Sequence, residues 1–204
     1  LVDQNTLCVV LDTHRGSYTE APELLSKIDK IVLIDHHRRS EEYIENTLLD
    51  YIEPYASSTC ELVSEIIQYM DDHIKLTKFE ADSLMAGIVV DTNSFTFKTG
   101  VRTFEAASYL RRNGADTVDV KELFNESLDS MKKKTEIIEK SEIKFGDVAI
   151  SYIDDLEENS NVIAAQSADE LLTIKDVKAS FVLVRNKDYI NVSGRSMGQV
   201  NVQV

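Results

Sequence analysis

The stretch IVLIDHHRRS, residues 31–40, decides the fold of the first half of the chain. Its four apolar residues run directly into Asp35, His36 and His37, so a strand without a polar face ends at a carboxylate and two imidazoles. Such strands are typical of parallel sheets, because helices cover both faces of the sheet. Ligands of open α/β sheets bind outside the carboxyl ends of the strands. We therefore predict a binding site at the end of this strand.

Two other stretches show the same pattern of an apolar run that ends in an acid. TLCVVLD, residues 6–12, ends at Asp12, and AGIVVD, residues 86–91, ends at Asp91. We predict strands over 6–12, 30–35 and 86–91. Apolar residues at three- and four-residue steps predict helices between these strands, over 21–28, 57–73 and 77–87. This alternation indicates an α/β domain with a mainly parallel sheet flanked by helices.

The second half of the chain starts with helices and returns to strands. We expect a helix over 102–115, closed by Gly114, and a long charged helix over 120–143 that bridges two domains. The later pattern predicts a strand over 148–154, a helix over 167–174, and a hairpin with strands over 179–186 and 189–196 and the turn RNKD. We therefore expect a domain over 1–120, a helical linker over 121–144 and a smaller, partial α/β domain over 145–204.

The charge of the chain limits the classes of ligand that it can bind. The 204 residues carry a formal net charge of −14, and no basic block is longer than the KKK run at 132–134. This argues against a long nucleic acid as partner, because such binding relies on many basic contacts to phosphate. An anionic substrate would instead need bound divalent cations to attract it.

The cysteines and the apolar runs indicate a cytoplasmic location. Cys8 and Cys60 stand in apolar or helical surroundings, so we expect both thiols to be reduced. No apolar run reaches the ~18 to 20 residues that span a bilayer, so we expect no membrane segment in this chain. The chain opens on LVDQNTLCVVLD without an initiator Met, and we expect it to be a fragment of a longer protein.

The acids at the predicted strand ends would repel one another and have raised pKa values unless a cation neutralised them. Asp12, Asp35 and Asp91 form, with the neighbouring imidazoles, a mixed oxygen and nitrogen set that suits Mn²⁺, Mg²⁺, Zn²⁺ or Fe²⁺ and favours manganese over calcium. Each acid alone can also be interpreted as a cap or turn residue, but the three together favour a metal site. His14 either lines this site or lies in a solvated loop, and Arg102 either orients a phosphate or is solvated.

The motifs LDTH at 11–14, IDHH at 34–37 and VDTNSF at 90–95 resemble, in this order, those of the DHH phosphoesterase superfamily. VSGRS at 192–196 resembles the entry to its companion domain, DHHA1. Longer stretches, such as DHHRRSEEYIENTLLDYIEPYASSTCELVSEII, resemble the cyclic-di-AMP phosphodiesterases of Gram-positive bacteria within that superfamily. This likeness covers essentially the whole chain.

The resemblance implies a role for each residue that matches a motif. Asp12 would bridge two manganese ions, and His36 and Asp91 would complete the ligand set. Asp35 would hold an imidazole in its ligating orientation. His37 would donate a hydrogen bond to the scissile phosphate as a catalytic residue. By the same likeness, Ser193, Gly194 and Arg195 of the second domain would bind substrate. His14 and Arg102, whose roles the motifs do not give, are our candidates for substrate binding in the first domain.

The reaction that the resemblance implies is hydrolysis of cyclic-di-AMP to linear pApA by a water that two metal ions activate. Two other functions stay open: a phosphoesterase of the same superfamily that acts on short RNA, and a non-catalytic module that senses nucleotides.

The sequence departs from the family's pattern at three places. Gly16 stands where a proline is expected. The family's first motif would precede residue 1, and its glycine-rich substrate loop would follow Val204. We therefore expect the chain alone to be inactive. The resemblance also implies a membrane-anchored parent with this region facing the cytoplasm, and it leaves a homodimer open.

Overall fold

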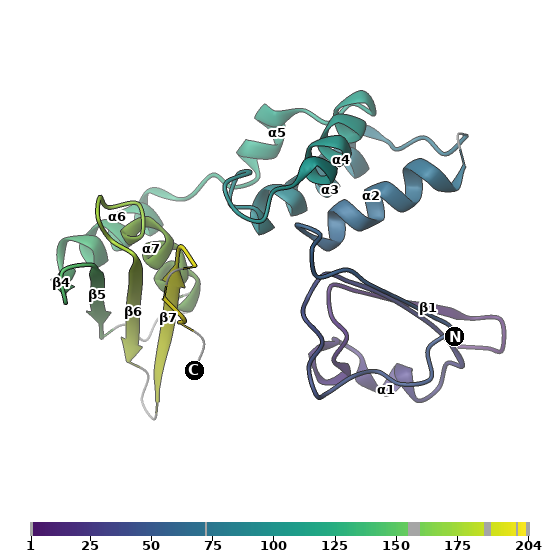
Figure 1. The fold of residues 1–204 in the computed structure, drawn as a ribbon, viewed down its shortest axis with the longest axis horizontal. Helices are drawn as coiled ribbons and strands as arrows, with labels where there is room; N and C mark the ends of the chain where they lie inside the picture. The colour runs from purple at the N-terminus through teal and green to yellow at the C-terminus, as the bar shows by residue number, and fades with distance from the viewer. Residues whose placement is uncertain (1, 72, 155–159, 186–188, 199, 203–204) are drawn as a thin grey trace. The chain divides into compact units, whose positions relative to one another are not determined.

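The computed structural model describes residues 2–71, 73–154, 160–185, 189–198 and 200–202. The chain divides into two compact units, residues 1–125 and 126–204 (Figure 1). Each unit has its own sheet and its own hydrophobic core. Within the described residues, no helix is both long enough and apolar enough to cross a membrane.

The sheet of the first unit contains three parallel strands in the order β1-β2-β3. They are β1 (Leu7–Leu11), β2 (Lys30–Asp35) and β3 (Leu49–Ile52). Their carboxyl ends meet at one edge, because Leu11 pairs with Ile34 and Asp35 pairs with Ile52. The α/β class and the strands predicted over 6–12 and 30–35 are confirmed. We did not predict β3, because its four residues, LDYI, form no long apolar run.

The strand predicted over 86–91 is wrong, because these residues complete helix α3 (Lys78–Asp91). The helix begins with a capping box between Thr77 and Glu80, in which each side chain accepts a hydrogen bond from the other residue's N–H. A short apolar run fits a buried strand and a buried helix equally well. Here the helical form is stabilised because three residues of one face enter a helical core: Ala81, Met85 and Ile88.

Helices lie on both faces of the sheet, but Leu7, Val9 and Leu11 of β1 stay exposed. On one face lies α2 (Thr59–Met70), which starts at the N-cap Ser58 and packs Leu62 on Ile34. On the other face, after η1 (Gly16–Tyr18), lies α1 (Pro22–Leu25), over a core of Val10, Ile31, Leu33 and Ile44. The helices α3 and α4 (Val101–Arg112) pack against α2, and α5 (Thr117–Glu122) packs against α3 (Figure 1).

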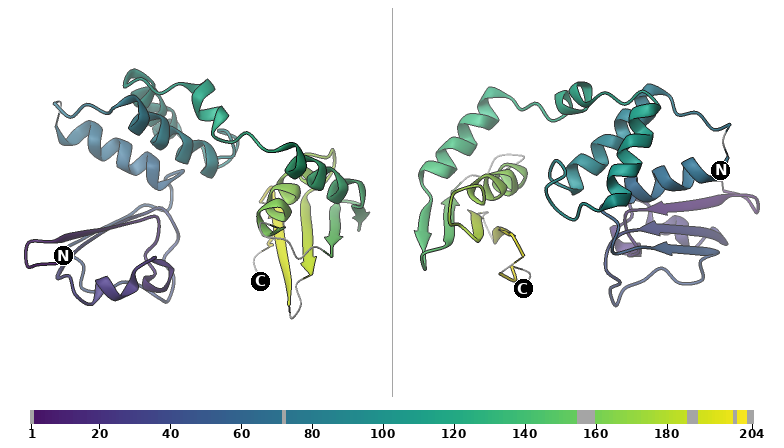
Figure 2. Two further views of the ribbon diagram at one scale, coloured as in Figure 1. Left: turned by 180° about the vertical axis from the view of Figure 1, so that it is seen from behind. Right: turned by 45° about the horizontal axis from the view of Figure 1, so that its top comes forward.

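The second unit is a four-stranded sheet with helices on one face (Figure 2). In the order β4-β5-β6-β7, the strands are β4 (Glu142–Lys144), β5 (Val148–Ile153), β6 (Ala179–Arg185) and β7 (Ile190–Ser196). The central pair β5 and β6 is parallel, and the outer pairs are antiparallel. The helices α6 (Leu128–Glu139) and α7 (Ser160–Leu171) pack together over the sheet, and the core lies between them and β6.

Two helix predictions in this region need correction. The single helix predicted over 120–143 is two helices, because α5 ends at Glu122 and Ser127 caps α6 by accepting a hydrogen bond from the Ser130 N–H. The helix predicted over 167–174 starts earlier, at Ser160, because the apolar residues before it continue its buried face. The strands of the hairpin are confirmed, whereas residues 186–188 of its predicted turn lie outside the described residues.

Candidate metal centre

Asp12 follows β1 directly, and two neighbouring elements fix its position. Its N–H donates to the Ile34 carbonyl oxygen at 3.0 Å, which continues the pairing of β1 with β2. Its φ of 65° is left-handed, a conformation that is uncommon for residues other than glycine and concentrates at functional sites. The hydroxyl of Thr59, in the first turn of α2, donates to Asp12 Oδ1 at 2.8 Å. The carboxylate is thereby held beside the start of α2.

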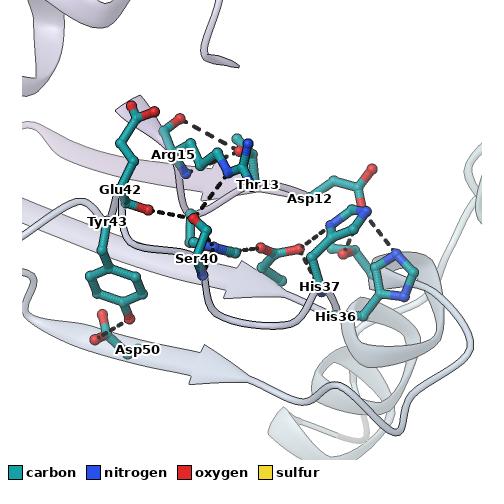
Figure 3. Close-up of polar contacts among 12 residues, drawn as sticks. Asp12, Thr13, Arg15, His36, His37, Ser40, Glu42, Tyr43 and Asp50 are labelled. Carbon is teal, nitrogen blue, oxygen red and sulfur yellow. Dashed lines mark hydrogen bonds and ion pairs between the residues drawn. The ribbon is translucent and has the colours of Figure 1, made fainter. Parts of the chain in front are cut away.

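His36 follows β2 and is 6% exposed. Its Nε2 atom lies 3.5 Å from Asp12 Oδ1 and 3.5 Å from Asp91 Oδ2. Its Nδ1 atom is buried and has no hydrogen-bond partner among the residues that the structure describes. One nitrogen of this imidazole therefore faces two carboxylates, and Figure 3 shows the ring beside Asp12.

Asp91 occupies the last turn of α3. The helix is followed by a left-handed residue, Asn93 with φ 45°. The Ser94 N–H closes the last turn by donating to the Val89 carbonyl oxygen at 2.8 Å. The C-terminal end of a helix carries partial negative charge, which disfavours a carboxylate there. Burial raises the pKa of Asp91 above its ordinary value; nearby imidazole opposes this rise, and the Asp12 carboxylate adds to it. A cation bound by Asp91 and Asp12 would offset both the cost of burying the Asp91 carboxylate and its repulsion by Asp12.

Of the three acids predicted to converge, Asp12 and Asp91 each place a carboxylate oxygen 3.5 Å from His36 Nε2, whereas Asp35 binds His14 and His37 instead. Asp12 comes from a strand end, as predicted, but Asp91 comes from the end of a helix. One ligand atom each from Asp12, His36 and His37 lies within 4.8 Å of the others, a spacing that a metal ion can bridge. His37 is therefore close enough to act as a ligand as well as to contact substrate.

Asp35 is fully buried and binds two imidazoles, neither of which is that of His36. Its Oδ1 lies 2.7 Å from His37 Nδ1 and accepts from the His37 N–H at 3.1 Å, and its Oδ2 lies 2.6 Å from His14 Nδ1. Burial alone would raise the pKa of Asp35, but the hydrogen bonds from His14 and His37 outweigh it and lower this pKa below its ordinary value. Asp35 is therefore a charged support for His37.

Two other candidates in the first unit are held by protein partners. His14 is buried behind Asp35, and this position favours an indirect role over contact with substrate. Arg102, near the start of α4, makes a two-pronged ion pair with Glu65 at 2.8 and 2.6 Å, and a looser one with Glu53 at 3.8 Å. Its guanidinium is partly exposed, so a ligand can still reach it.

The candidates of the second unit lie on β7, an edge strand. Ser193 pairs with Val182 and Arg195 pairs with Ser180, so both lie on the face that α7 covers. There Arg195 Nε donates to Asp169 Oδ1 of α7 at 2.7 Å. Gly194 lies on the opposite face, where an added Cβ would be 3.1 Å from the Phe181 ring. Ser193 and Arg195 therefore lie on one face of β7, and Gly194 lies on the other.

Sequence reasoning missed residues that support the site. The hydroxyl of Thr59 binds Asp12, and Ser40 binds His14. Their signal was weak, since hydroxyl residues near helix starts and loops are common as caps. Cys60 is also nearby: burial, followed by the charges of Asp91 and Asp12, raises its pKa to about 11, so its thiol stays protonated near neutral pH.

The donor set fits a divalent metal ion. Carboxylate oxygens with imidazole nitrogen suit Mn²⁺, Zn²⁺ or Fe²⁺. The two acids face one imidazole nitrogen, and one of them stands at a helix end where positive charge is stabilising. A bound cation would therefore offset the negative charge of Asp12 and Asp91 more fully than the single imidazole of His36 does.

Comparison with known proteins identifies the first part of the chain. Residues 1–88 match the DHH family, N-terminal domain. The match covers 88 of the 204 residues, and we refer to this part of the chain as the DHH domain. It contains Asp12, His36 and His37, and Asp91 follows shortly after the last matched residue.

The DHH domain and the residues after it are similar to cyclic-di-AMP phosphodiesterases. The chain is 51% identical over 205 residues to the cyclic-di-AMP phosphodiesterase GdpP of Geobacillus thermodenitrificans, a match that covers 100% of the chain and 31% of that protein. It is 46% identical over 204 residues to the cyclic-di-AMP phosphodiesterase PdeA of Listeria monocytogenes, with coverage of 100% and 31%. The chain therefore spans about a third of the length of these relatives.

A solved structure has the same fold as the DHH domain and the second unit. It is an exopolyphosphatase-related protein from Bacteroides fragilis, with a TM-score of 0.80 and 22% sequence identity, over 93% of this chain and 58% of that one. At this identity the likeness supports the α/β architecture alone.

Proposed function

We propose that this chain forms the DHH domain and a DHHA1-type substrate-binding domain of a metal-dependent phosphodiesterase that hydrolyses cyclic-di-AMP to linear pApA. The observation that carries the proposal is the cluster of Asp12, His36 and Asp91, in a chain similar along its whole length to proteins named for this activity. The net charge of −14 supports a small anionic substrate, bound through cations, over a long nucleic acid.

In this proposal Asp12, His36 and Asp91 bind Mn²⁺, for which the mixed oxygen and nitrogen donors are well suited. When bound, two such ions lower the pKa of a water molecule and neutralise charge on the phosphodiester. Thr59 keeps Asp12 beside His36 through its hydrogen bond of 2.8 Å. The closed last turn of α3 keeps Asp91 near the same nitrogen, with its Oδ2 atom 3.5 Å from His36 Nε2.

His37 is the candidate for contact with the scissile phosphate. It is 54% exposed, in contrast to its buried neighbour His36. Asp35 binds its Nδ1 atom, which leaves Nε2 without a partner in that pair, and one ligand atom of His37 lies within 4.8 Å of those of Asp12 and His36. A ring that carries a proton on each nitrogen donates one hydrogen bond to Asp35 and one from Nε2 to a phosphate oxygen.

Nucleotide binding is proposed for Arg102 in the first unit and for Arg195, with Ser193 and Gly194, in the second. Both guanidinium groups are partly exposed and held in place by acids, Glu65 and Asp169 respectively. A fixed guanidinium loses less freedom when it binds a phosphate. We also propose that the longer protein is anchored to a membrane, with this region in the cytoplasm.

The test is product analysis by mass spectrometry in Mn²⁺ with cyclic-di-AMP or short RNA as the substrate, together with a titration of cyclic-di-AMP binding, using the protein at its natural length and the 204-residue chain. We expect pApA from the longer protein, and loss of turnover when a chelator removes the metal. The matched variants are His36→Ala, which removes a proposed ligand, and Arg39→Ala, whose guanidinium lies over the Tyr43 ring at 4.0 Å.

The three outcomes of this experiment separate the candidate functions. Loss of turnover in His36→Ala, with Arg39→Ala near wild type, supports the proposal. Faster cleavage of short RNA than of cyclic-di-AMP would assign the protein to the superfamily's RNA-directed branch. Tight binding of cyclic-di-AMP without any product would identify a sensing module and contradict the enzyme assignment.

A further inference from the structure

His14 links the end of β1 to the loop that follows β2, and it does so with both ring nitrogens. The residue is 3% exposed. Its Nδ1 atom lies 2.6 Å from Asp35 Oδ2, and its Nε2 atom lies 3.0 Å from the backbone nitrogen of Ser40. A buried imidazole with two polar partners, outside the proposed metal ligands, needs an explanation that packing alone does not supply.

The partners of His14 determine which nitrogen carries the proton. A backbone N–H can only donate, so the Ser40 N–H requires an unprotonated Nε2 as its acceptor. The Ser40 hydroxyl lies 3.0 Å from the same Nε2 atom but donates its own proton to the Glu42 carbonyl oxygen at 2.7 Å, so the backbone N–H is the Ser40 donor that Nε2 accepts. The proton of the neutral His14 ring is therefore on Nδ1, where it is donated to Asp35 Oδ2.

This bond fixes the orientation of Asp35. With Oδ2 bound to His14, the carboxylate cannot rotate without breaking a buried hydrogen bond, and Oδ1 is left for His37. The His37 ring is more than half exposed, so few packing contacts restrict its rotamer. The orientation of His37 thus depends on Asp35, and the orientation of Asp35 depends on His14.

We infer that His14 is a positioning residue for His37, which acts through Asp35 and without contact to substrate. The inference rests on the proposed function only where turnover is concerned. His36 is held by a separate pair of acids, Asp12 and Asp91, so a change at His14 reaches the His37 half of the site and leaves the other half intact.

Two amide variants test this role, because they differ by one methylene. In His14→Asn the amide nitrogen takes the place of Nδ1 and can donate to Asp35, whereas in His14→Gln the amide lies at the place of Nε2 and reaches Ser40 instead. We expect kcat to stay within about threefold of wild type in the His14→Asn variant. In the His14→Gln variant we expect kcat to fall on the order of 10²-fold, as it does when a catalytic group, here His37, is misplaced. KM and Mn²⁺ affinity should be unchanged in both, and their melting temperatures should be similar.

A second readout requires no turnover. Long-range ¹H–¹⁵N spectra of the metal-free chain report which nitrogen of each histidine carries its proton, and the signals are assigned by substitution. We expect a proton on Nδ1 of His14, and a hydrogen-bonded proton on Nδ1 of His37 that persists in His14→Asn and disappears in His14→Gln.

The two readouts fail in different ways. A proton on Nε2 of His14, or a His37 signal that is the same in both variants, would overturn the positioning role whatever the activity is. Equal kcat in the Asn and Gln variants would overturn it as well. If the expected spectra accompany a wild-type protein of natural length without phosphodiesterase activity, the positioning of His37 is supported and the proposed function fails.

Discussion

The rings of His36 and His37 are 4.4 Å apart, yet different acids hold them. His36 faces Asp12 and Asp91 with Nε2, whereas His37 is bound through Nδ1 to Asp35. The first ring is buried and the second is mostly open to solvent. Two adjacent residues at the end of β2 can therefore have different tasks, metal binding for one and substrate contact for the other.

This division predicts that alanine variants of the two histidines fail differently. We expect His36→Ala to lose most of its Mn²⁺ affinity, because it removes the nitrogen between the two carboxylates. His37→Ala should retain Mn²⁺ affinity within about threefold and lose ~10²-fold in kcat, the usual size of an acid–base or hydrogen-bond contribution. Calorimetric titration with Mn²⁺ and steady-state kinetics provide the two numbers. Similar losses of Mn²⁺ affinity in both variants would make His37 a ligand.

A packing contact beneath the site gives a prediction for stability. Gly87 of α3 lies against Cys60 of α2, and an added Cβ would be 2.2 Å from the Cys60 sulfur and 3.1 Å from its Cβ. Gly87→Ala should therefore lower the free energy of unfolding by about 1–3 kcal/mol, as overpacked cores do, although alanine favours a helix over glycine. Urea unfolding measures the change.

The control for Gly87→Ala is the same substitution in a Cys60→Ala background, which removes the sulfur. We expect the loss from Gly87→Ala to shrink or change sign there, because the 2.2 Å contact with the sulfur is gone and only the 3.1 Å contact with the Cβ of residue 60 then opposes the helix propensity of alanine. An equal loss in both backgrounds would show that the Cys60 sulfur is not what excludes a side chain at position 87.

Local sequence pattern was enough for the elements whose partners are close by. β1 and β2 are recognisable because each is a continuous apolar run next to an Asp, and the two strands pair in a parallel sheet. β2 is the buried strand of the two, whereas β1 lies at the edge of the sheet with Leu7, Val9 and Leu11 exposed. The pattern did not separate helix from strand at 86–91, because a buried helix can be as apolar as a buried strand. There the deciding contacts come from α2 and α4, which the local sequence does not encode.

The sequence pattern pointed to the acids of the candidate site, but it did not reveal the hydroxyl residues that hydrogen-bond to the site. Asp12 and His36 follow strands, so the sheet itself brings them together. The links from Thr59 to Asp12 and from Ser40 to His14 join residues that are distant in sequence, and hydroxyl side chains have many other uses. Those supports become visible only when the chain is folded.

In the second unit, Arg195 is expected to matter for affinity more than for metal content. We expect Arg195→Ala to raise KM about tenfold or more, since a charged contact to phosphate contributes ~1.5–3 kcal/mol, while Mn²⁺ affinity stays unchanged. Asp169→Ala is the matched control, because it releases the same guanidinium without removing it. An unchanged KM in Arg195→Ala would mean that this arginine pairs with Asp169 and does not bind the nucleotide.

The place of Asp91 predicts opposite effects of one substitution with and without metal. In the metal-free chain the carboxylate faces the negative end of α3 and the charge of Asp12, and its pKa is raised chiefly by burial. A raised folded-state pKa means that ionisation costs stability as the pH rises past the ordinary carboxyl value. Asp91→Asn, which cannot ionise, should therefore be more stable than wild type near pH 7, by about 0.3–1 kcal/mol from the helix-end term.

With Mn²⁺ present the order should reverse, because a ligand that binds only the folded state stabilises it by mass action. Wild type should gain stability with increasing Mn²⁺, and Asp91→Asn should gain little, since an amide is a poorer ligand than a carboxylate. Urea unfolding at pH 7, with chelator and with Mn²⁺, gives the free energy of unfolding of both proteins in both conditions. Near pH 3 in chelator, the extra stability of Asp91→Asn should disappear, because the Asp91 carboxyl of wild type is then protonated. If Asp91→Asn were less stable than wild type in chelator, the Asp91 charge would not destabilise the metal-free chain. If it gained as much stability from Mn²⁺ as wild type, Asp91 would not be a metal ligand.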